Sequence, residues 1–393
     1  IIQEMSSYYL NYITFGGVMF LPVFLGLYYG VCRRISTAQA FLYGVREISI
    51  FRLLQPVVAL PAFPLLLFLL AELRRPRGSN WIFGAAGFLL AYAFVVTIAV
   101  PVLHHGRTPS IYQYLQVKRR FVPFKKPTKR RSALDKERYH SRFLKIFTCF
   151  LFFVATTIYT VVLLSLIAHA THFLLPAESW MISGLMGSVA LFSIIIGGLS
   201  ASVDLSSALF LLAGAASLIA VAVKDFAGFS LKKNLSFDFG LFQDDVVSVY
   251  EAGAFGFISA LHLLIGNQIL YQHWSSAAGL RKSRGTLLVA FPASLATFAA
   301  VFLAARSLAG RRCEENPDEP ENGDVLEAAI RTLVRTWTEY PGMAGYTAAG
   351  LVSFGICAVA ANFLGQTTVF WEDFLWSGLK SVKEKKQILL IQV

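Results

Sequence analysis

Charged residues are scarce in this sequence. Asp, Glu, Lys and Arg make up only 15% of the 393 residues, whereas 56% are hydrophobic and the mean hydropathy is +0.59. Soluble domains carry about 25% charged residues, so this composition indicates a polytopic membrane protein. The net charge of +12 lies mostly in one segment between apolar runs, where positive charge signals topology, so it is no evidence for nucleic-acid binding.

Cysteine and catalytic motifs are also sparse. Four cysteines occur far apart, without the spacing of metal ligands: Cys32, Cys149, Cys313 and Cys357. The sequence contains no Ser-His-Asp or Cys-His arrangement, phosphate-binding loop or paired-acid motif. We therefore expect neither an internal disulfide nor an enzyme.

Long apolar runs dominate the chain instead. Nine of them are long enough to span a bilayer as helices, because about 20 residues at 1.5 Å each cross the hydrocarbon core. These runs cover residues 10–31, 50–72, 81–103, 143–168, 181–203, 206–223, 251–271, 286–308 and 343–371. Since lipid offers no partner to unpaired backbone groups, every span should be helical, and the sequence predicts an all-α protein.

The basic residues predict the orientation of these spans. The segment between the third and fourth runs contains Lys118, Arg119, Arg120, Lys125, Lys126, Lys129, Arg130, Arg131, Lys136 and Arg138. The positive-inside rule places this segment in the cytoplasm and the N-terminus outside, although the cluster Arg74–Arg77 then falls on the outer side. Residues 118–142 can bind anionic lipid head groups, at about 1 kcal/mol per basic residue near the surface, or only fix the topology, and the two roles are compatible.

Two of the predicted spans are interrupted. The second span contains Pro56, Pro61 and Pro64, and each proline removes a helical hydrogen-bond donor. The seventh contains Gly266-Asn267-Gln268, polar groups that are costly in lipid without internal partners. Interrupted helices at corresponding positions of two repeats hold the solute in many transporters, and these two interruptions are five spans apart. The alternatives are a packing kink in the second span and a helix cap in the seventh.

The last predicted span differs from the others in its side chains. Residues 343–371 are crowded with Gly, Ala and Ser, which let helix backbones approach closely inside a membrane bundle. A helix that faces lipid would instead be rich in Leu and Phe all round. We therefore expect this helix to be internal.

Several stretches, in this order, resemble motifs of the sodium:solute symporters. They include Phe20–Gly30 and Phe41–Ser49, similar to the family's "IGLYYG" and "YLLGGRSMS", Thr108–Lys118, Gly197–Leu199, Asn267-Gln268 with Tyr271-Gln272, Cys313, Pro341–Gly345 and Glu372-Asp373. Together they cover nearly the whole chain. The resemblance implies a five-plus-five inverted repeat preceded by one extra helix.

That fold implies a division of the chain. Residues 1–34 are expected to hold the extra N-terminal helix, and residues 40–224 the first repeat, with its basic cytoplasmic loop at 104–142. An extracellular loop then covers residues 225–250. The first three helices of a truncated second repeat occupy 251–374, and a basic cytoplasmic tail occupies 375–393.

The resemblance also implies a sodium site. In the family, carbonyls of the broken first core helix and hydroxyls of the eighth bind the ion, and oxygen ligands suit such a hard cation. The aligned positions here are Ala59, Ala62, Cys357, Ala360 and Ala361. Because methyl groups stand where the two hydroxyls are needed, at Ala360 and Ala361, the alignment argues against sodium coupling.

These observations give a function hypothesis and an alternative. The sequence favours a secondary transporter in the plasma membrane that moves a small organic solute or an anion by alternating access, with Gln55, Asn267 and Gln268 beside the solute. The alternative is a non-transporting relative that acts as a sensor or as a partner of another membrane protein. The loss of hydroxyls at Ala360 and Ala361 motivates that alternative.

Overall fold

The described part of the chain is built from helices. The computed structural model describes residues 2–32, 37–44, 56–58, 60, 78–106, 110–115, 142–172, 178–209, 247–277, 279–315, 342–375 and 391. Within these ranges every element is helical and no strand occurs, which confirms the all-α prediction.

Five helices are long: α1 (Ile2–Val31), α6 (Arg142–His172), α7 (Ser179–Leu209), α11 (Leu280–Glu315) and α13 (Met343–Phe370). The shorter α-helices are α2 (Ala38–Tyr43), α4 (Gly84–Phe94), α5 (Val100–Gly106), α9 (Val249–Leu261) and α10 (Gln268–Ser275). Two 3₁₀ turns, η1 (Gly78–Phe83) and η3 (Ile111–Leu115), and three π-helical turns, η2 (Val95–Ala99), η7 (His262–Gly266) and η8 (Trp371–Leu375), complete the described elements.

Six stretches of the described residues are long and apolar enough to cross a membrane. They are Tyr9–Tyr29, Asn80–His104, Phe143–Ala168, Ser179–Leu205, Val249–Gly266 and Met343–Leu375. Each matches one of the nine predicted spans. The predicted span 286–308 lies within α11, which is helical but is not among the six, and the predicted spans 50–72 and 206–223 lie mostly outside the described residues.

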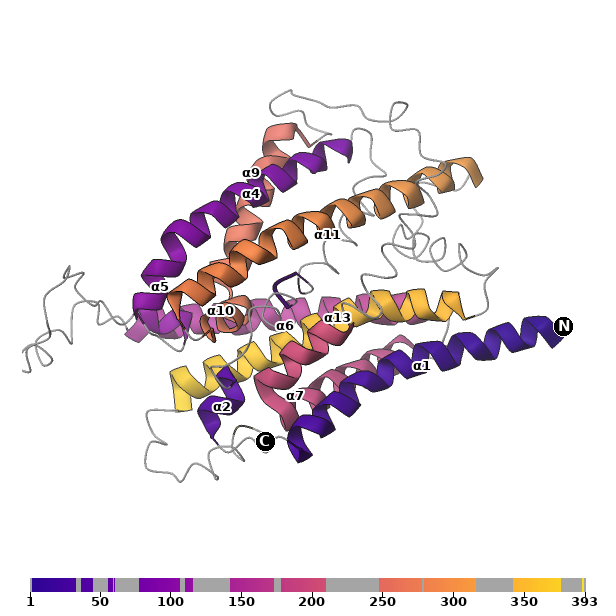
Figure 1. Ribbon diagram of the computed structural model, residues 1–393, viewed down its shortest axis with the longest axis horizontal. Coiled ribbons are helices and arrows are strands. Elements are labelled where there is room, and N and C mark those ends of the chain that lie inside the picture. The colour runs from indigo at the N-terminus through magenta and orange to yellow at the C-terminus, as the bar shows by residue number, and fades with distance from the viewer. Residues whose placement is uncertain are drawn as a thin grey trace, which may run out of the picture.

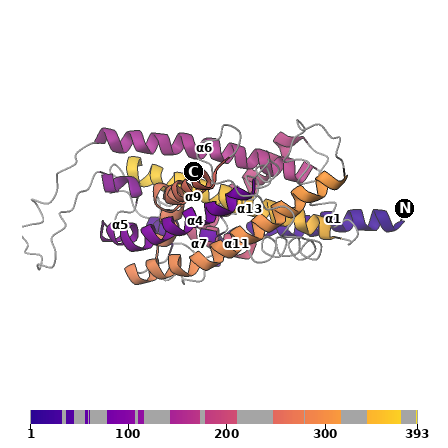
Figure 2. The same cartoon turned by 90° about the horizontal axis from the view of Figure 1, so that it is seen from above.

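The helices pack in two groups (Figure 1). In one group α1, α6, α7 and α13 contact one another, and in the other α4 contacts α9 and α11. The short helix α10 touches both α13 and α11 and so joins the groups. Seen from above, α6 and α11 run along opposite sides of the molecule, with α13 and α4 between them (Figure 2).

Helix α13 is the internal helix that its small residues predict. Over an apolar stretch of 18 residues in its candidate span 94% of the residues are buried, against 22–44% in the corresponding stretches of the other five. Two of its glycines show why small residues are needed, since a Cβ on Gly345 would overlap the carbonyl of Asn11 and one on Gly365 would lie 2.7 Å from a side-chain carbon of Ile269. Close backbone approach of this kind replaces hydrophobic burial as the source of helix association in lipid.

Helix α7 contains a break that the proline and polar patterns do not predict. Gly198 has φ 56° and ψ −149° inside the helix, a conformation that favours glycine. Helix α2 packs against the kink, and only a glycine leaves room for it there, because a Cβ on Gly198 would lie 2.5 Å from the carbonyl oxygen of Phe41. Helix α2 is itself started by the Thr37 hydroxyl, which accepts from Ala40 N at 3.1 Å.

Candidate functional site

The predicted interruption of the seventh span is present between α9 and α10. Helix α9 starts with a capping box of Ser248 and Glu251, and its α-helical geometry ends at Leu261. The π-helical turn η7 follows, and Asn267 then adopts an extended conformation, with φ −114° and ψ 127°. A helix broken inside a membrane protein needs partners for its freed backbone groups, and the indole of Trp274 donates to Leu264 O at 2.9 Å.

The two polar residues of this interruption have different partners. Asn267 is half-buried, and its side-chain oxygen caps α10 by accepting from Ile269 N at 2.9 Å. Gln268 is fully buried, and its side-chain oxygen accepts from Ile111 N in η3, also at 2.9 Å. The cap that the sequence offers as an alternative is therefore formed at Asn267, while Gln268 joins α10 to the turn η3.

The other half of the predicted solute site lies largely outside the described residues. Gln55, Ala59 and Ala62 belong to this undescribed part. Of the second span, residues 56–58 and 60 are described, and they are buried.

The wall that α13 contributes at the aligned sodium positions carries no side-chain oxygen. Cys357, Ala360 and Ala361 are each at most 1% exposed, and their side chains end in a thiol or methyl groups. The nearest polar side chains of the helix are engaged elsewhere, since the Ser353 hydroxyl donates to Ala349 O at 2.6 Å and the Asn362 amide donates to Thr160. The described residues of this wall do not fit a hard cation that prefers oxygen ligands.

A polar seam joins α13 to α6. It consists of Asn362 and Gln366 on α13 and Thr156 and Thr160 on α6, each pair spaced four residues apart and therefore on one helix face. Asn362 Nδ2 donates to Thr160 Oγ1 at 3.1 Å, and Gln366 Nε2 donates to Thr156 Oγ1 at 2.9 Å. The threonine hydroxyls donate in turn to carbonyls four residues back, so each hydroxyl of the seam both accepts and donates.

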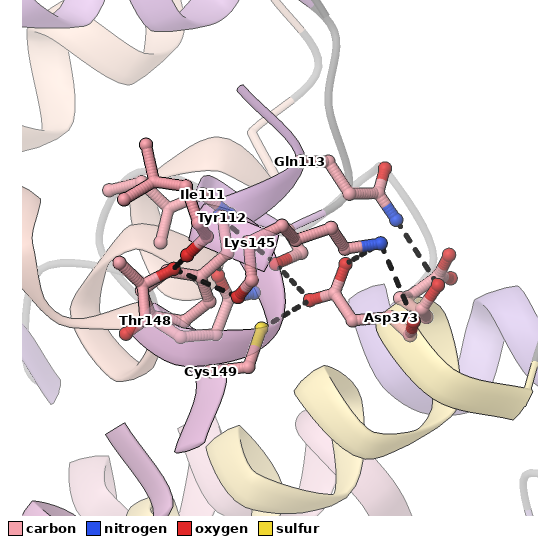
Figure 3. A network of polar contacts seen from close by, with 11 residues as sticks. Ile111, Tyr112, Gln113, Lys145, Thr148, Cys149 and Asp373 are labelled. Atoms are coloured by element: carbon pink, nitrogen blue, oxygen red, sulfur yellow. Dashed lines mark hydrogen bonds and ion pairs between the residues drawn. The ribbon is translucent and has the colours of Figure 1, made fainter. Parts of the chain in front are cut away.

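Beyond the end of α13, the turn η8 meets α6 in a network around Asp373 (Figure 3). The Asp373 side chain is fully buried, and its carboxylate accepts from the Ser110 hydroxyl at 2.6 Å and from the Cys149 thiol at 3.7 Å. The Lys145 ammonium lies 3.0 Å from the other carboxylate oxygen and also donates to the Asp373 carbonyl. A buried carboxylate needs such a charged partner because its desolvation is costly.

Further contacts extend this network to the turn η3 and to helix α2. Gln113 donates to the Glu372 carbonyl at 3.3 Å, and the Tyr112 ring packs against Phe152 with centroids 5.4 Å apart. The Gln272 amide of α10 donates to Leu42 O of α2. Elements α2, η3, α6, α10 and η8 are thus linked at one end of the molecule. We call these contacts the cytoplasmic network, after the side of the membrane that the basic residues predict for this end.

Burial shifts the pKa of several titratable groups at this end, Tyr43 and His273 among them. Burial raises the pKa of the Tyr43 phenol well above its ordinary value, and the Glu372 carboxylate beside it acts in the same direction. Burial also lowers the pKa of His273 in α10 to about 4. The His273 ring contacts Ile269 O through Nδ1 at 2.6 Å, while its buried Nε2 has no hydrogen-bond partner within the part of the chain that the structure describes.

The cytoplasmic network is the part of the site that the sequence patterns leave unassigned. Its residues include Ser110 and Asp373, which lie in motifs that resemble those of the family but for which the resemblance implies no role. A signal for it does exist, because Lys145 at the start of one apolar span and Asp373 at the end of another are opposite charges at the same predicted membrane face.

Comparison with known proteins supports the fold. No family model matches the chain, and no curated protein sequence matches it. Among solved structures the chain is similar to a Na⁺-coupled sialic acid symporter in its substrate-bound, outward-open state, with a TM-score of 0.77. The similarity covers 98% of this chain and 78% of the symporter at 13% sequence identity, so it shows a sodium-symporter-type transporter fold and leaves substrate and coupling to experiment.

Proposed function

We propose that the protein is a multi-pass secondary transporter of the sodium:solute symporter type, which moves a small organic solute or an anion across the plasma membrane by alternating access. The observation that carries this proposal is the interruption at Asn267 inside the transporter fold. Helix α9, which precedes the interruption in the chain, packs on α4. Helix α10, which follows it, is hydrogen-bonded to η3 and to α2. The two halves of one span can therefore follow different neighbours, which alternating access requires.

The cytoplasmic network supplies the inner barrier in this proposal. Asp373 holds η3 through Ser110 and holds α6 through Lys145 and Cys149, so these contacts must separate before a solute can leave toward the cytoplasm. The solute would lie on the outer side of this barrier, beside Asn267, Gln268 and Gln55. Localisation in the plasma membrane and an outer N-terminus belong to the same proposal, on the strength of the basic segment at 118–142.

Sodium is a separate part of the proposal. The similar symporter is sodium-coupled, whereas Ala360 and Ala361 provide no oxygen at the aligned positions of α13. We propose that transport by this chain does not require a sodium ion bound at these positions of α13. Uptake that is equal in sodium and in choline buffers would support this, and uptake that needs sodium would contradict it.

Uptake into proteoliposomes tests the proposed function directly. The panel comprises sialic acid, neutral sugars, monocarboxylates, vitamins with a carboxylate, and iodide. We expect saturable uptake of at least one solute. The variant Asn267→Ser keeps an oxygen that can cap α10 but removes the amide, so we expect it to weaken solute affinity while leaving folding intact, with Ser188→Ala on the exposed side of α7 as the control. Absence of uptake across the panel would contradict transport.

A non-transporting sensor or assembly partner is the second candidate. The same two alanines favour it, since they remove ligands that a coupled transporter would use. The double variant Ala360→Ser/Ala361→Ser separates the candidates. Sodium-dependent uptake gained by this variant would support a transporter that has lost its coupling site, whereas no uptake together with unchanged binding of a membrane-protein partner would support the second candidate.

A further inference from the structure

The polar seam between α6 and α13 reaches the lipid-facing surface along one edge. The Gln366 amide nitrogen lies 2.9 Å from Thr156 Oγ1 and 3.5 Å from Thr157 Oγ1. Thr156 is buried, whereas Thr157 is exposed and Gln366 is half-buried. Thr157 is also close to the middle of the span Phe143–Ala168, so lipid tails and not head groups surround this edge.

The Thr157 hydroxyl has an unused donor. The other threonines of α6 each donate to the carbonyl four residues back, which satisfies a hydroxyl inside a helix: Thr148, Thr156, Thr160 and Thr171. Within the described part of the chain Thr157 makes no such bond, and in its contact with Gln366 Nε2 the hydroxyl oxygen is the acceptor. The proton of Thr157 therefore has no acceptor among the described residues.

Gln366 has the complementary group, an unused acceptor. The Thr156 hydroxyl donates its proton to Phe152 O at 2.6 Å, so the amide nitrogen of Gln366, and not its oxygen, must face that hydroxyl. The side-chain oxygen Oε1 then points away from Thr156, and no described residue donates to it. A polar group in lipid is costly until it finds a partner, and here two such groups lie side by side.

Aromatic side chains surround these two groups. Helix α13 is buried along most of its length, but it comes to the surface at Gln366 and Phe370, and Phe374 of the following turn η8 is exposed as well. Phe153 of α6 packs on both phenylalanines, with ring centroids 6.4 and 6.3 Å apart. We call these four residues and Thr157 the α6–α13 patch. Because α6 runs along one side of the molecule, the patch can meet another protein in the bilayer (Figure 2).

We propose that the α6–α13 patch is the surface through which two copies of this chain form a dimer in the membrane. In a two-fold dimer one surface meets itself, so a donor and an acceptor on one copy face the acceptor and the donor on the other. Each Thr157 hydroxyl donates to Gln366 Oε1 of the other copy, and both unused groups are satisfied. Lipid tails satisfy neither group, and the dimer does not depend on the proposed transport.

Energy transfer between fluorescently labelled copies in liposomes measures this association. The labels are attached to a cysteine introduced at the exposed residue Tyr250 of α9, in protein with Cys32 and Cys313 replaced by serine. Over a series of protein-to-lipid ratios, transfer should follow a monomer–dimer equilibrium and should exceed the transfer expected from random encounters.

Matched substitutions locate the interface. Thr157→Val removes the unused donor and should raise the dissociation constant about tenfold or more, because each dimer loses two interhelical hydrogen bonds. The melting temperature should stay unchanged, since the hydroxyl makes only a 3.5 Å contact within its own copy. Gln366→Leu should weaken the dimer to a similar extent. The control is Thr97→Val, an exposed threonine whose hydroxyl donates within its own helix, and it should have no effect.

Mixing the two variants tests the reciprocal contact. A dimer of one Thr157→Val copy and one Gln366→Leu copy keeps one hydrogen bond, whereas each variant with itself keeps none. Mixed dimers should therefore dissociate about threefold less readily than either homodimer. Monomers at every protein-to-lipid ratio would overturn the proposal and leave the patch to a different membrane helix. A dimer that Thr157→Val weakens no more than Thr97→Val does would also overturn it, even if Gln366→Leu destabilises the fold through Thr156.

Discussion

At the scale of single residues, the cytoplasmic network and the adjoining helix α10 contain buried groups with incomplete or charged partners. The Asp373 side chain is fully buried and has the Lys145 ammonium beside it, and His273 has a buried ring nitrogen without a hydrogen-bond partner among the described residues. Removing one member of a buried pair usually costs more than the pair contributes, because the other charge is left desolvated. These residues should therefore give large and specific effects when changed.

We expect Asp373→Asn to open the cytoplasmic network. The change leaves Lys145 without its carboxylate and weakens the contacts to Ser110 and Cys149, at an expected cost of about 3 kcal/mol to the closed arrangement. Cys149 is fully buried, so its reaction with a maleimide added from the cytoplasmic side reports opening. Labelling should rise at least severalfold in Asp373→Asn and remain low in Thr148→Ala; equal labelling in both would refute the assigned role.

His273 should make the folded protein sensitive to acid. Because burial lowers its pKa to about 4, the unfolded chain binds a proton at higher pH than the folded one, so stability falls as the pH drops from about 6.5 toward 4. The expected loss over this window is about 3 kcal/mol. His273→Phe should flatten this part of the thermal-stability profile, whereas His262→Phe, at an exposed position, should not; two identical profiles would count against the assignment.

At the scale of secondary-structure elements, polar and small residues join the helices. The seam between α6 and α13 predicts a measurable coupling of about 0.6–1.7 kcal/mol for an interhelical hydrogen bond in a membrane. A double-mutant cycle of Thr160→Val and Asn362→Leu measures it through thermal unfolding in detergent. Thr97→Val, whose hydroxyl bonds within its own helix, should show no coupling to Asn362→Leu.

The kink in α7 gives a second prediction for an element. Gly198→Ala should destabilise the protein by about 1–3 kcal/mol, because φ 56° is strained for alanine and its Cβ would press on Phe41 O. Gly187→Ala in the same helix adds a Cβ at an ordinary 3.5 Å from Leu164 and is the matched control. Similar melting temperatures for the two variants would show that the kink carries no strain.

Sequence patterns predict some of these elements and not others. The small residues of 343–371 predict an internal helix, and Gly266-Asn267-Gln268 predicts the interruption, because each pattern has one physical reason in lipid. The kink at Gly198 is not predictable from hydropathy, since Gly184 and Gly187 lie in the same apolar helix and keep helical geometry. The cytoplasmic network and the close approach of α4 to α9 at Gly87 and Gly253 depend on which residues meet across distant parts of the chain, and a single sequence does not contain that pairing.

At the scale of the whole molecule, two groups of helices meet at a broken span. The group of α1, α6, α7 and α13 is held by close backbone contacts and the polar seam. In the other group, α4 and α9 touch through the backbones of their glycines, and Tyr92 of α4 contacts Ser294 and Phe291 of α11. Because α10 touches both groups, a change at Asn267 can be passed to either side. We propose that alternating access depends on this arrangement of the two groups around the broken span.

The accessibility of position 267 tests that account most directly, because it needs no knowledge of the solute. A cysteine replaces Asn267 in protein with Cys32 and Cys313 changed to serine, and membrane-impermeant thiol reagents are applied to one side of oriented vesicles at a time. Alternating access predicts labelling from the outside in one population and from the cytoplasm in another, with Asp373→Asn shifting labelling toward the cytoplasmic side. Labelling from one side alone, unchanged by Asp373→Asn, would contradict it.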